Sequence, residues 1–144
     1  MDQHAHLNIL DTHVWLWLME GDPRLADAVV DELEQSASMG TLSVLTLSLW
    51  EVAMFEAAGR IRFLVPVDTW LSEALETPGL NLLEIDATMA AESVRLPEDF
   101  DGDAVDRLLV SAARTRNGVL YTADPAIIAY GERGWVHVHA VRVP

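Results

Sequence analysis

Four acidic residues, Asp11, Glu51, Asp106 and Asp124, stand at points where the chain is expected to turn into a helix. Carboxylate oxygens are the ligands that Mg²⁺ and Mn²⁺ prefer, and acids without cysteine or histidine suit these ions better than zinc. One or two such ions lower the pKa of a bound water and neutralise charge that develops on a phosphate during in-line attack. If the four carboxylates meet in the fold, the sequence therefore predicts metal-assisted phosphate chemistry with these acids as ligands.

Each acid also has a local explanation at a helix N-terminus, where free backbone N–H groups bond to a carboxylate. The candidate caps are Asp11, Asp124 followed by Pro125, Asp103 and Asp106 together in one first turn, and Ser48 with Glu51 in an S-x-x-E capping box. A cap contributes only about 1 kcal/mol. Stability therefore does not require all four acids at one place, whereas a metal site does.

The elements that must position these acids alternate along the chain. Apolar runs predict strands at residues 7–10, 41–46, 80–85, 119–122 and 136–141. Helical spacing predicts a helix after the first strand and others at residues 24–38, 48–58, 67–75, 87–95, 103–117 and 125–130. Strands separated by helices imply a parallel sheet covered on both faces, with ligands outside the carboxyl ends of the strands. Asp11, Glu51 and Asp124 follow strands, so topology alone is expected to gather these three.

Length and composition indicate one domain over residues 1–144. A chain of 144 residues, 51% hydrophobic, is long enough for one core and too short for two ordinary domains. It contains no cysteine, which excludes disulfides, thiolate nucleophiles and thiolate metal sites and fits a reducing cytoplasm. No apolar run approaches the roughly 18 residues that a membrane span needs, so no membrane partner is expected.

The charge pattern narrows the chemistry further. The formal net charge is −14, and all nine basic residues are arginine. Without lysine the chain can form neither a P-loop, whose phosphate cradle ends in lysine, nor a Schiff base. Phosphate chemistry in this chain would therefore need metal ions.

Four sequence strings, in this order and spacing, carry a resemblance to a known family. They are NILDTHVWLW near the start, SLWEVA with its trailing GRI, GDAVDRLLVSAA, and LYTADPAIIAYG near the end. Together they resemble the PIN domain, and specifically the VapC-type toxin ribonucleases of bacterial and archaeal toxin–antitoxin pairs. The likeness runs over nearly the whole chain.

This resemblance implies a three-layer α/β/α sandwich with a mostly parallel central sheet. It also implies Mg²⁺- or Mn²⁺-dependent cleavage of RNA that inhibits translation and growth, a homodimer, and inhibition by a VapB-like antitoxin. The metal-binding acids of the family map onto Asp11, Glu51, Asp106 and Asp124, and Asp103 matches a further candidate ligand. Relatives often carry a lysine in the helix after the glutamate, where this chain has phenylalanine, and a proline where it has alanine at position 104.

Two other functions share this architecture. A non-catalytic module of the same fold would use the acidic pocket to hold a basic peptide. A receiver-like switch phosphorylated on aspartate would have the same sheet and acidic edge, but the usual lysine partner is absent here.

On so acidic a chain, RNA would have to meet a local positive patch. The substrate-binding candidates are Arg107, Arg114 and Arg116 on the helix predicted at 103–117, joined by Arg60 and Arg62 after Gly59. The alternative is that these arginines form surface ion pairs with nearby acids.

Two tryptophans in the helix after Asp11 are two positions apart and cannot share one helix face. One of Trp15 and Trp17 is therefore expected to be exposed, for a partner or a dimer interface.

Overall fold

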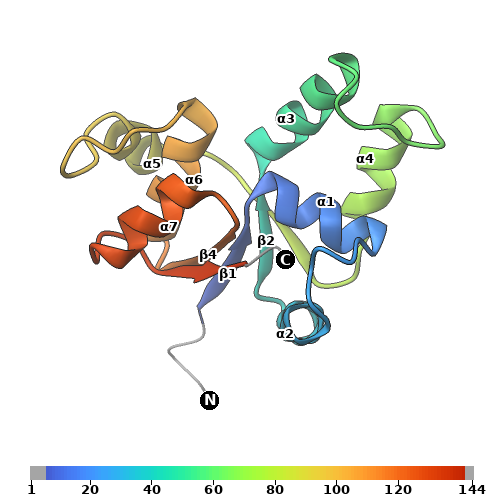
Figure 1. The fold of residues 1–144 in the computed structure, drawn as a ribbon, viewed down its shortest axis with the longest axis horizontal. Helices are drawn as coiled ribbons and strands as arrows, with labels where there is room; N and C mark the ends of the chain where they lie inside the picture. Colours follow the sequence, from blue (N-terminus) through green and yellow to red (C-terminus); the bar gives the residue numbers. More distant parts are fainter. Residues whose placement is uncertain (1–5, 142–144) are drawn as a thin grey trace.

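The strands of the computed structural model, which describes residues 6–141, form one sheet. The strands are β1 (Leu7–Leu10), β2 (Leu42–Leu45), β3 (Leu80–Leu83), β4 (Gly118–Thr122) and β5 (Val138–Ala140). Their order in space is β3-β2-β1-β4-β5, and every neighbouring pair is parallel. β1 therefore lies in the middle of the sheet (Figure 1), and the carboxyl ends of all the strands meet at the same edge.

Within the described residues, helices connect these strands. They are α1 (Thr12–Glu20), α2 (Asp27–Ser38), α3 (Thr46–Ala57), α4 (Val67–Leu75), α5 (Ala87–Ser93), α6 (Ala104–Thr115) and α7 (Pro125–Glu132). None of the helices in this part of the chain has both the length and the apolar character that crossing a bilayer requires.

The sheet is buried on both faces, because consecutive residues of a strand point to opposite sides. In β1, the fully buried Ile9 packs with residues of α5, α6 and α7, whereas its neighbour Leu10 packs with residues of α1, α2, α3 and α4. Figure 1 shows these two groups of helices on opposite sides of the sheet. The predicted three-layer α/β/α sandwich is confirmed, and all its strand pairs are parallel.

The helix N-termini follow the predicted caps with one exception. Carboxylates of Asp11, Asp103 and Asp124 accept backbone N–H groups at the starts of α1, α6 and α7. The capping box predicted for Ser48 and Glu51 is wrong, because β2 passes directly into α3, which begins two residues before Ser48. Ser48 is therefore buried inside the first turn, and the carboxylate of Glu51, in the second turn, is not used as a cap.

Candidate active site

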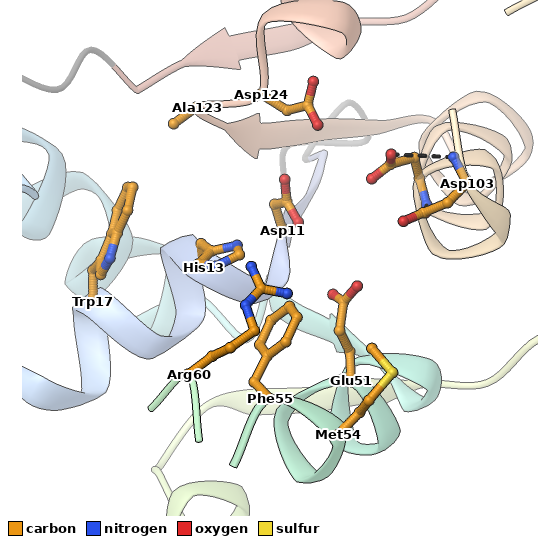
Figure 2. Close-up of a pocket in the computed structure, with 11 residues that line it drawn as sticks. Asp11, His13, Trp17, Glu51, Met54, Phe55, Arg60, Asp103, Ala123 and Asp124 are labelled. Atoms are coloured by element: carbon orange, nitrogen blue, oxygen red, sulfur yellow. Dashed lines mark hydrogen bonds between the residues drawn. The ribbon is translucent and has the colours of Figure 1, made fainter. Parts of the chain in front are cut away.

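A pocket of about 360 Å³ lies at the carboxyl edge of the sheet, beside the ends of β1 and β4. Its lining includes the carboxylates of Asp11, Glu51, Asp103, Asp106 and Asp124. They come from α3, α6 and the N-caps of α1, α6 and α7, and Figure 2 shows Asp11, Glu51 and Asp124 around a common space. The structure thus brings together the acids that the sequence singled out.

Asp11 is the most firmly held of these acids. The residue is only 9% exposed. Its Oδ1 accepts a hydrogen bond from the Thr12 N–H at 2.7 Å, and its Oδ2 accepts one from the Thr122 hydroxyl at 2.6 Å. The Thr122 oxygen also accepts the Asp124 N–H at 3.0 Å. Burial raises the pKa of Asp11, although both hydrogen bonds favour the charged form. Both Asp11 oxygens keep a lone pair for a further partner.

Glu51 faces Asp11 from α3, and its residue is 8% exposed. Burial raises the pKa of Glu51, and the negative charge of Asp103 adds to this effect. Beside it, the Thr12 hydroxyl donates to Ser48 Oγ at 2.9 Å, which ties the start of α1 to α3. Glu51 is therefore a buried carboxyl on a helix that is fixed against the Asp11 helix.

Asp103 and Asp106 form a capping box at the start of α6. Asp103 Oδ1 accepts the Asp106 N–H at 2.9 Å, and Asp106 Oδ2 lies 3.4 Å from the Asp103 N–H. Burial raises the pKa of Asp106 to about 7, and the negative charges of Asp103, Asp124 and Asp11 contribute in that order. Three neighbouring carboxylates therefore add to the effect of burial at Asp106, compared with one each at Asp11 and Glu51.

Comparison with known proteins identifies the family. The PIN domain family model matches residues 9–132, which include every acid of the pocket. The chain is also 32% identical to Ribonuclease VapC22 of Mycobacterium tuberculosis (strain ATCC 25618 / H37Rv) over 116 residues, covering 81% of this chain and 85% of that protein. The chain belongs to the PIN-domain family, among the VapC ribonucleases. The predicted resemblance and enzyme class are confirmed.

Solved structures show the same PIN fold at low sequence identity. The VapBC2 complex of Rickettsia felis bound to a DNA fragment from its promoter gives a TM-score of 0.69 at 16% identity, covering 94% of this chain and 98% of that one. DNA-bound VapBC of Salmonella typhimurium gives a TM-score of 0.68 at 13% identity, covering 96% of this chain and 100% of that one. At this identity the likeness is one of fold.

PIN-domain ribonucleases generally use divalent metals, and the donors of this pocket fit such an ion because they are almost all carboxylate oxygens. Within residues 6–141, however, no three histidine, aspartate or glutamate side chains are already arranged to hold one. Asp106 and Asp124 each direct one oxygen at backbone N–H groups. The predicted ligands therefore share one pocket without forming a finished cluster.

One arginine, Arg60, reaches the PIN-domain pocket. Its guanidinium carbon lies 4.4 Å from the centre of the Phe55 ring. The centre of the His13 ring lies 5.0 Å from the centre of the same Phe55 ring. Figure 2 shows the Arg60 guanidinium beside Asp11 and Glu51. Phe55 stands in the helix region where relatives often have lysine, and here it supports a positive charge that comes from the following loop.

The other predicted substrate-binding arginines lie elsewhere. Arg107 donates to backbone carbonyls of Phe100, Ser93 and Gly102, which ties the acidic loop before α6 to that helix. Arg114 bonds to Glu92 and the Trp135 carbonyl, and Arg116 pairs with Asp86 at 3.1 Å. None of the three lines the acidic pocket. Their contact with a substrate stays a prediction.

Sequence reasoning missed the hydroxyl groups that hold the acids. Thr12 and Thr122 are fully buried; the Thr122 hydroxyl donates to Asp11, whereas Thr12 donates its backbone N–H to Asp11 and its hydroxyl to Ser48. The available signal was their position: Thr12 directly follows Asp11, and Thr122 is the last residue of the strand before Asp124. Trp15 is buried and Trp17 is half-buried at the pocket, so the prediction that one of the two is exposed is wrong, although they do lie on different faces of the helix.

Proposed function

We propose that this chain is the toxin of a VapBC-type pair and cleaves RNA at the acidic pocket in a reaction that needs Mg²⁺ or Mn²⁺. The observation that carries the proposal is that five carboxylates, supplied by four helices and their caps, line one pocket in a VapC-family chain. RNA cleavage by such a toxin would stop translation and growth in the cytoplasm.

We assign Asp11, Glu51, Asp106 and Asp124 as the metal ligands, with Asp103 as a further candidate. A divalent ion at this position lowers the pKa of bound water and offsets charge on the phosphate. The chain itself orients Asp11 through the hydroxyl of Thr122 and the N–H of Thr12.

The charge of the pocket depends on the protonation of Asp106 and on the guanidinium of Arg60. Because the pKa of Asp106 is about 7 without an ion, a cation competes with a proton for this carboxyl near neutral pH. Arg60 places a guanidinium at the same pocket and is available to bind an oxygen of the RNA phosphate.

Substituting the ligands tests this function. Asp11→Asn and Asp106→Asn each remove one charge and almost no volume, so each should reduce RNA cleavage by more than about 100-fold and relieve growth inhibition, since even outer partners of metal ligands cost 10–100-fold. The matched control is Asp31→Asn, an exposed acid in the middle of α2. Circular dichroism should show the same fold in all three variants. Full cleavage activity in both pocket variants would overturn the proposal.

The solved relatives are VapBC complexes, which supports a VapB-like antitoxin as the partner of this chain. Co-expression with the product of the adjacent reading frame should yield a complex that no longer cleaves RNA.

Light scattering of the free chain should give twice the mass of one chain if the proposed homodimer forms, and the mass of a single chain would contradict it.

The alternative is a non-catalytic module that holds a basic peptide. It is favoured by two observations within the described residues: the carboxylates make capping bonds, and they are not already arranged as a metal cluster. Such a module would bind a peptide rich in arginine and lysine without cleaving RNA under any metal condition. Metal-dependent cleavage excludes it.

A further inference from the structure

A second groove, of about 290 Å³, adjoins the acidic pocket. The two share His13, Trp17 and Arg60 as lining residues, so they are parts of one depression. Figure 2 shows the acids on one side of Arg60 and Trp17 on the other. The groove continues past Trp17 along α1 and the segment after α3, which adds Arg62 and Phe63 to its lining.

The groove is lined by three positive side chains and two negative ones, Glu20 and Asp22, whereas acids predominate in the pocket. Of the eight arginines within residues 6–141, three line it: Arg24, Arg60 and Arg62. Arg24 is paired with Asp22 at 2.8 Å. Neither Arg60 nor Arg62 forms an ion pair with a carboxylate anywhere in the described chain. Arg60 therefore lies beside the acids without a direct ion pair, and Arg62 lies in the adjoining groove, on a protein whose overall charge is −14.

Aromatic rings stand beside these charges. Trp17 is half-buried, and the Arg24 guanidinium carbon lies 5.2 Å from its ring centre. Phe63 is stacked on the buried Trp70, with ring centres 4.5 Å apart, so its own ring is held in place. A cationic groove with fixed aromatic rings is the arrangement that binds single-stranded nucleic acid, because phosphates meet the cations and bases stack on the rings.

We propose that this groove, named here the arginine groove (Trp17, Arg24, Arg60, Arg62 and Phe63), binds the nucleotides of single-stranded RNA next to the bond that is cleaved. Arg60 and Arg62 bind successive phosphates, and Trp17 and Phe63 receive bases. The inference rests on the proposed function, since it locates the substrate strand of the same site. The groove offers aromatic rings on which unpaired bases stack, which a duplex does not present, and Arg60 and Arg62 repel a basic peptide.

Binding as a function of salt tests the two phosphate contacts. The protein carries Asp106→Asn to prevent cleavage, the probe is a fluorescent eight-nucleotide RNA, and magnesium is held constant. Arg60→Gln and Arg62→Gln should each weaken binding several-fold and reduce the slope of log affinity against log salt by about 0.7, the value for one single-strand phosphate contact. Arg95→Gln is the matched control, because Arg95 is exposed and lies outside both the pocket and the groove. Both arginines are exposed, so the fold should tolerate their replacement.

The aromatic contact has a separate readout. Trp17→Leu keeps an apolar side chain but removes the ring, so it should weaken RNA binding by about 5-fold or more and leave the salt slope unchanged. Duplex RNA of the same sequence should bind more weakly than the single strand.

Three outcomes would overturn the assignment of RNA to the arginine groove. The first is that Arg60→Gln and Arg62→Gln bind RNA with the same affinity and salt slope as Arg95→Gln. The others are that a duplex binds as tightly as the single strand, or that a basic peptide binds more tightly than RNA. Cleavage by the otherwise unchanged protein is measured in parallel. If it cleaves RNA while the arginine variants match the control, only the groove assignment fails; if it does not cleave at all, the proposed function fails as well.

Discussion

The hydroxyl of Thr122 donates a 2.6 Å hydrogen bond to Asp11, a residue 111 positions away in the sequence. The same oxygen accepts the backbone N–H of Asp124 at 3.0 Å. The hydroxyl of one buried threonine at the end of β4 therefore fixes two acids of the pocket: it holds the side chain of Asp11 and the backbone of Asp124. We regard Thr122 as a positioning residue for the proposed metal site.

Replacing Thr122 tests this role. Thr122→Val keeps the shape of the side chain but removes the donor to Asp11, so the pKa of Asp11 should rise further and Mn²⁺ affinity should fall by about 10-fold or more. Thr122→Ser retains the hydroxyl and should restore most of the affinity. Calorimetric titration with Mn²⁺ measures both. Equal affinities for the valine and serine variants would show that the hydrogen bond does not matter.

The raised pKa of Asp106 predicts how stability depends on pH. Asp106 has a pKa of about 7 in the folded protein and an ordinary value of 3.8, so between these values the folded state holds a proton that the unfolded state has lost. The stability that this group contributes is therefore complete below about pH 4 and is lost as the pH rises through 7. In metal-free buffer, Asp106→Asn should be more stable than the parent protein at pH 8, by about 1–2 kcal/mol after allowance for solvent screening.

That advantage of Asp106→Asn should shrink steadily toward pH 5. Asp11 and Glu51 also have raised pKa values and change stability in the same direction, so the difference between the two proteins reports Asp106 together with its coupling to Asp11. Urea unfolding across the pH range measures the difference. An advantage that stays constant from pH 5 to pH 8 would contradict the assignment of the shift to Asp106.

Gly79, in the turn between α4 and β3, is expected to be intolerant of any side chain. Its φ is +82°, and a Cβ there would lie 1.8 Å from the carbonyl oxygen of Ala37. Gly79→Ala should therefore destabilise the fold by about 2 kcal/mol or more, through backbone strain and overpacking. Gly40→Ala is the control, because Gly40 has a φ of +73° but open space around it, and it should show only the cost of the backbone conformation. Thermal unfolding that ranks the two variants equally would exclude the clash.

Much of the fold could be predicted from local sequence signals. The helix predicted at residues 67–75 is α4 (Val67–Leu75), because its apolar spacing is helical and a proline and a glycine follow it. The predicted strand at 80–85 ends two residues early, at Leu83, because hydrogen bonding to β2 stops at its end. The position of β1 in the middle of the sheet could not be derived from the alternation of strands and helices, since that pattern leaves the strand order open.

The sequence predicted the acids of the site and named Arg60 among the substrate-binding candidates, but it did not predict how these residues are held. Asp11 and Asp124 follow neighbouring parallel strands, so their proximity followed from topology. The position of Arg60 depends on how the loop after Gly59 folds back so that the guanidinium covers Phe55, and no local pattern encodes that path. Thr122 gave no signal of its own, because a buried threonine at a strand end is an ordinary core residue until its distant partner is known.

The most direct test of the metal site is a calorimetric titration of Mn²⁺ into the parent protein, Asp11→Asn, Asp106→Asn and the control Asp31→Asn at pH 7.5. The expected result is saturable binding in the parent protein and in Asp31→Asn, with affinity lowered by more than about 10-fold in each pocket variant. If all four proteins bind Mn²⁺ equally, or if none binds it, the acids of the pocket do not form the metal site that the proposed function requires.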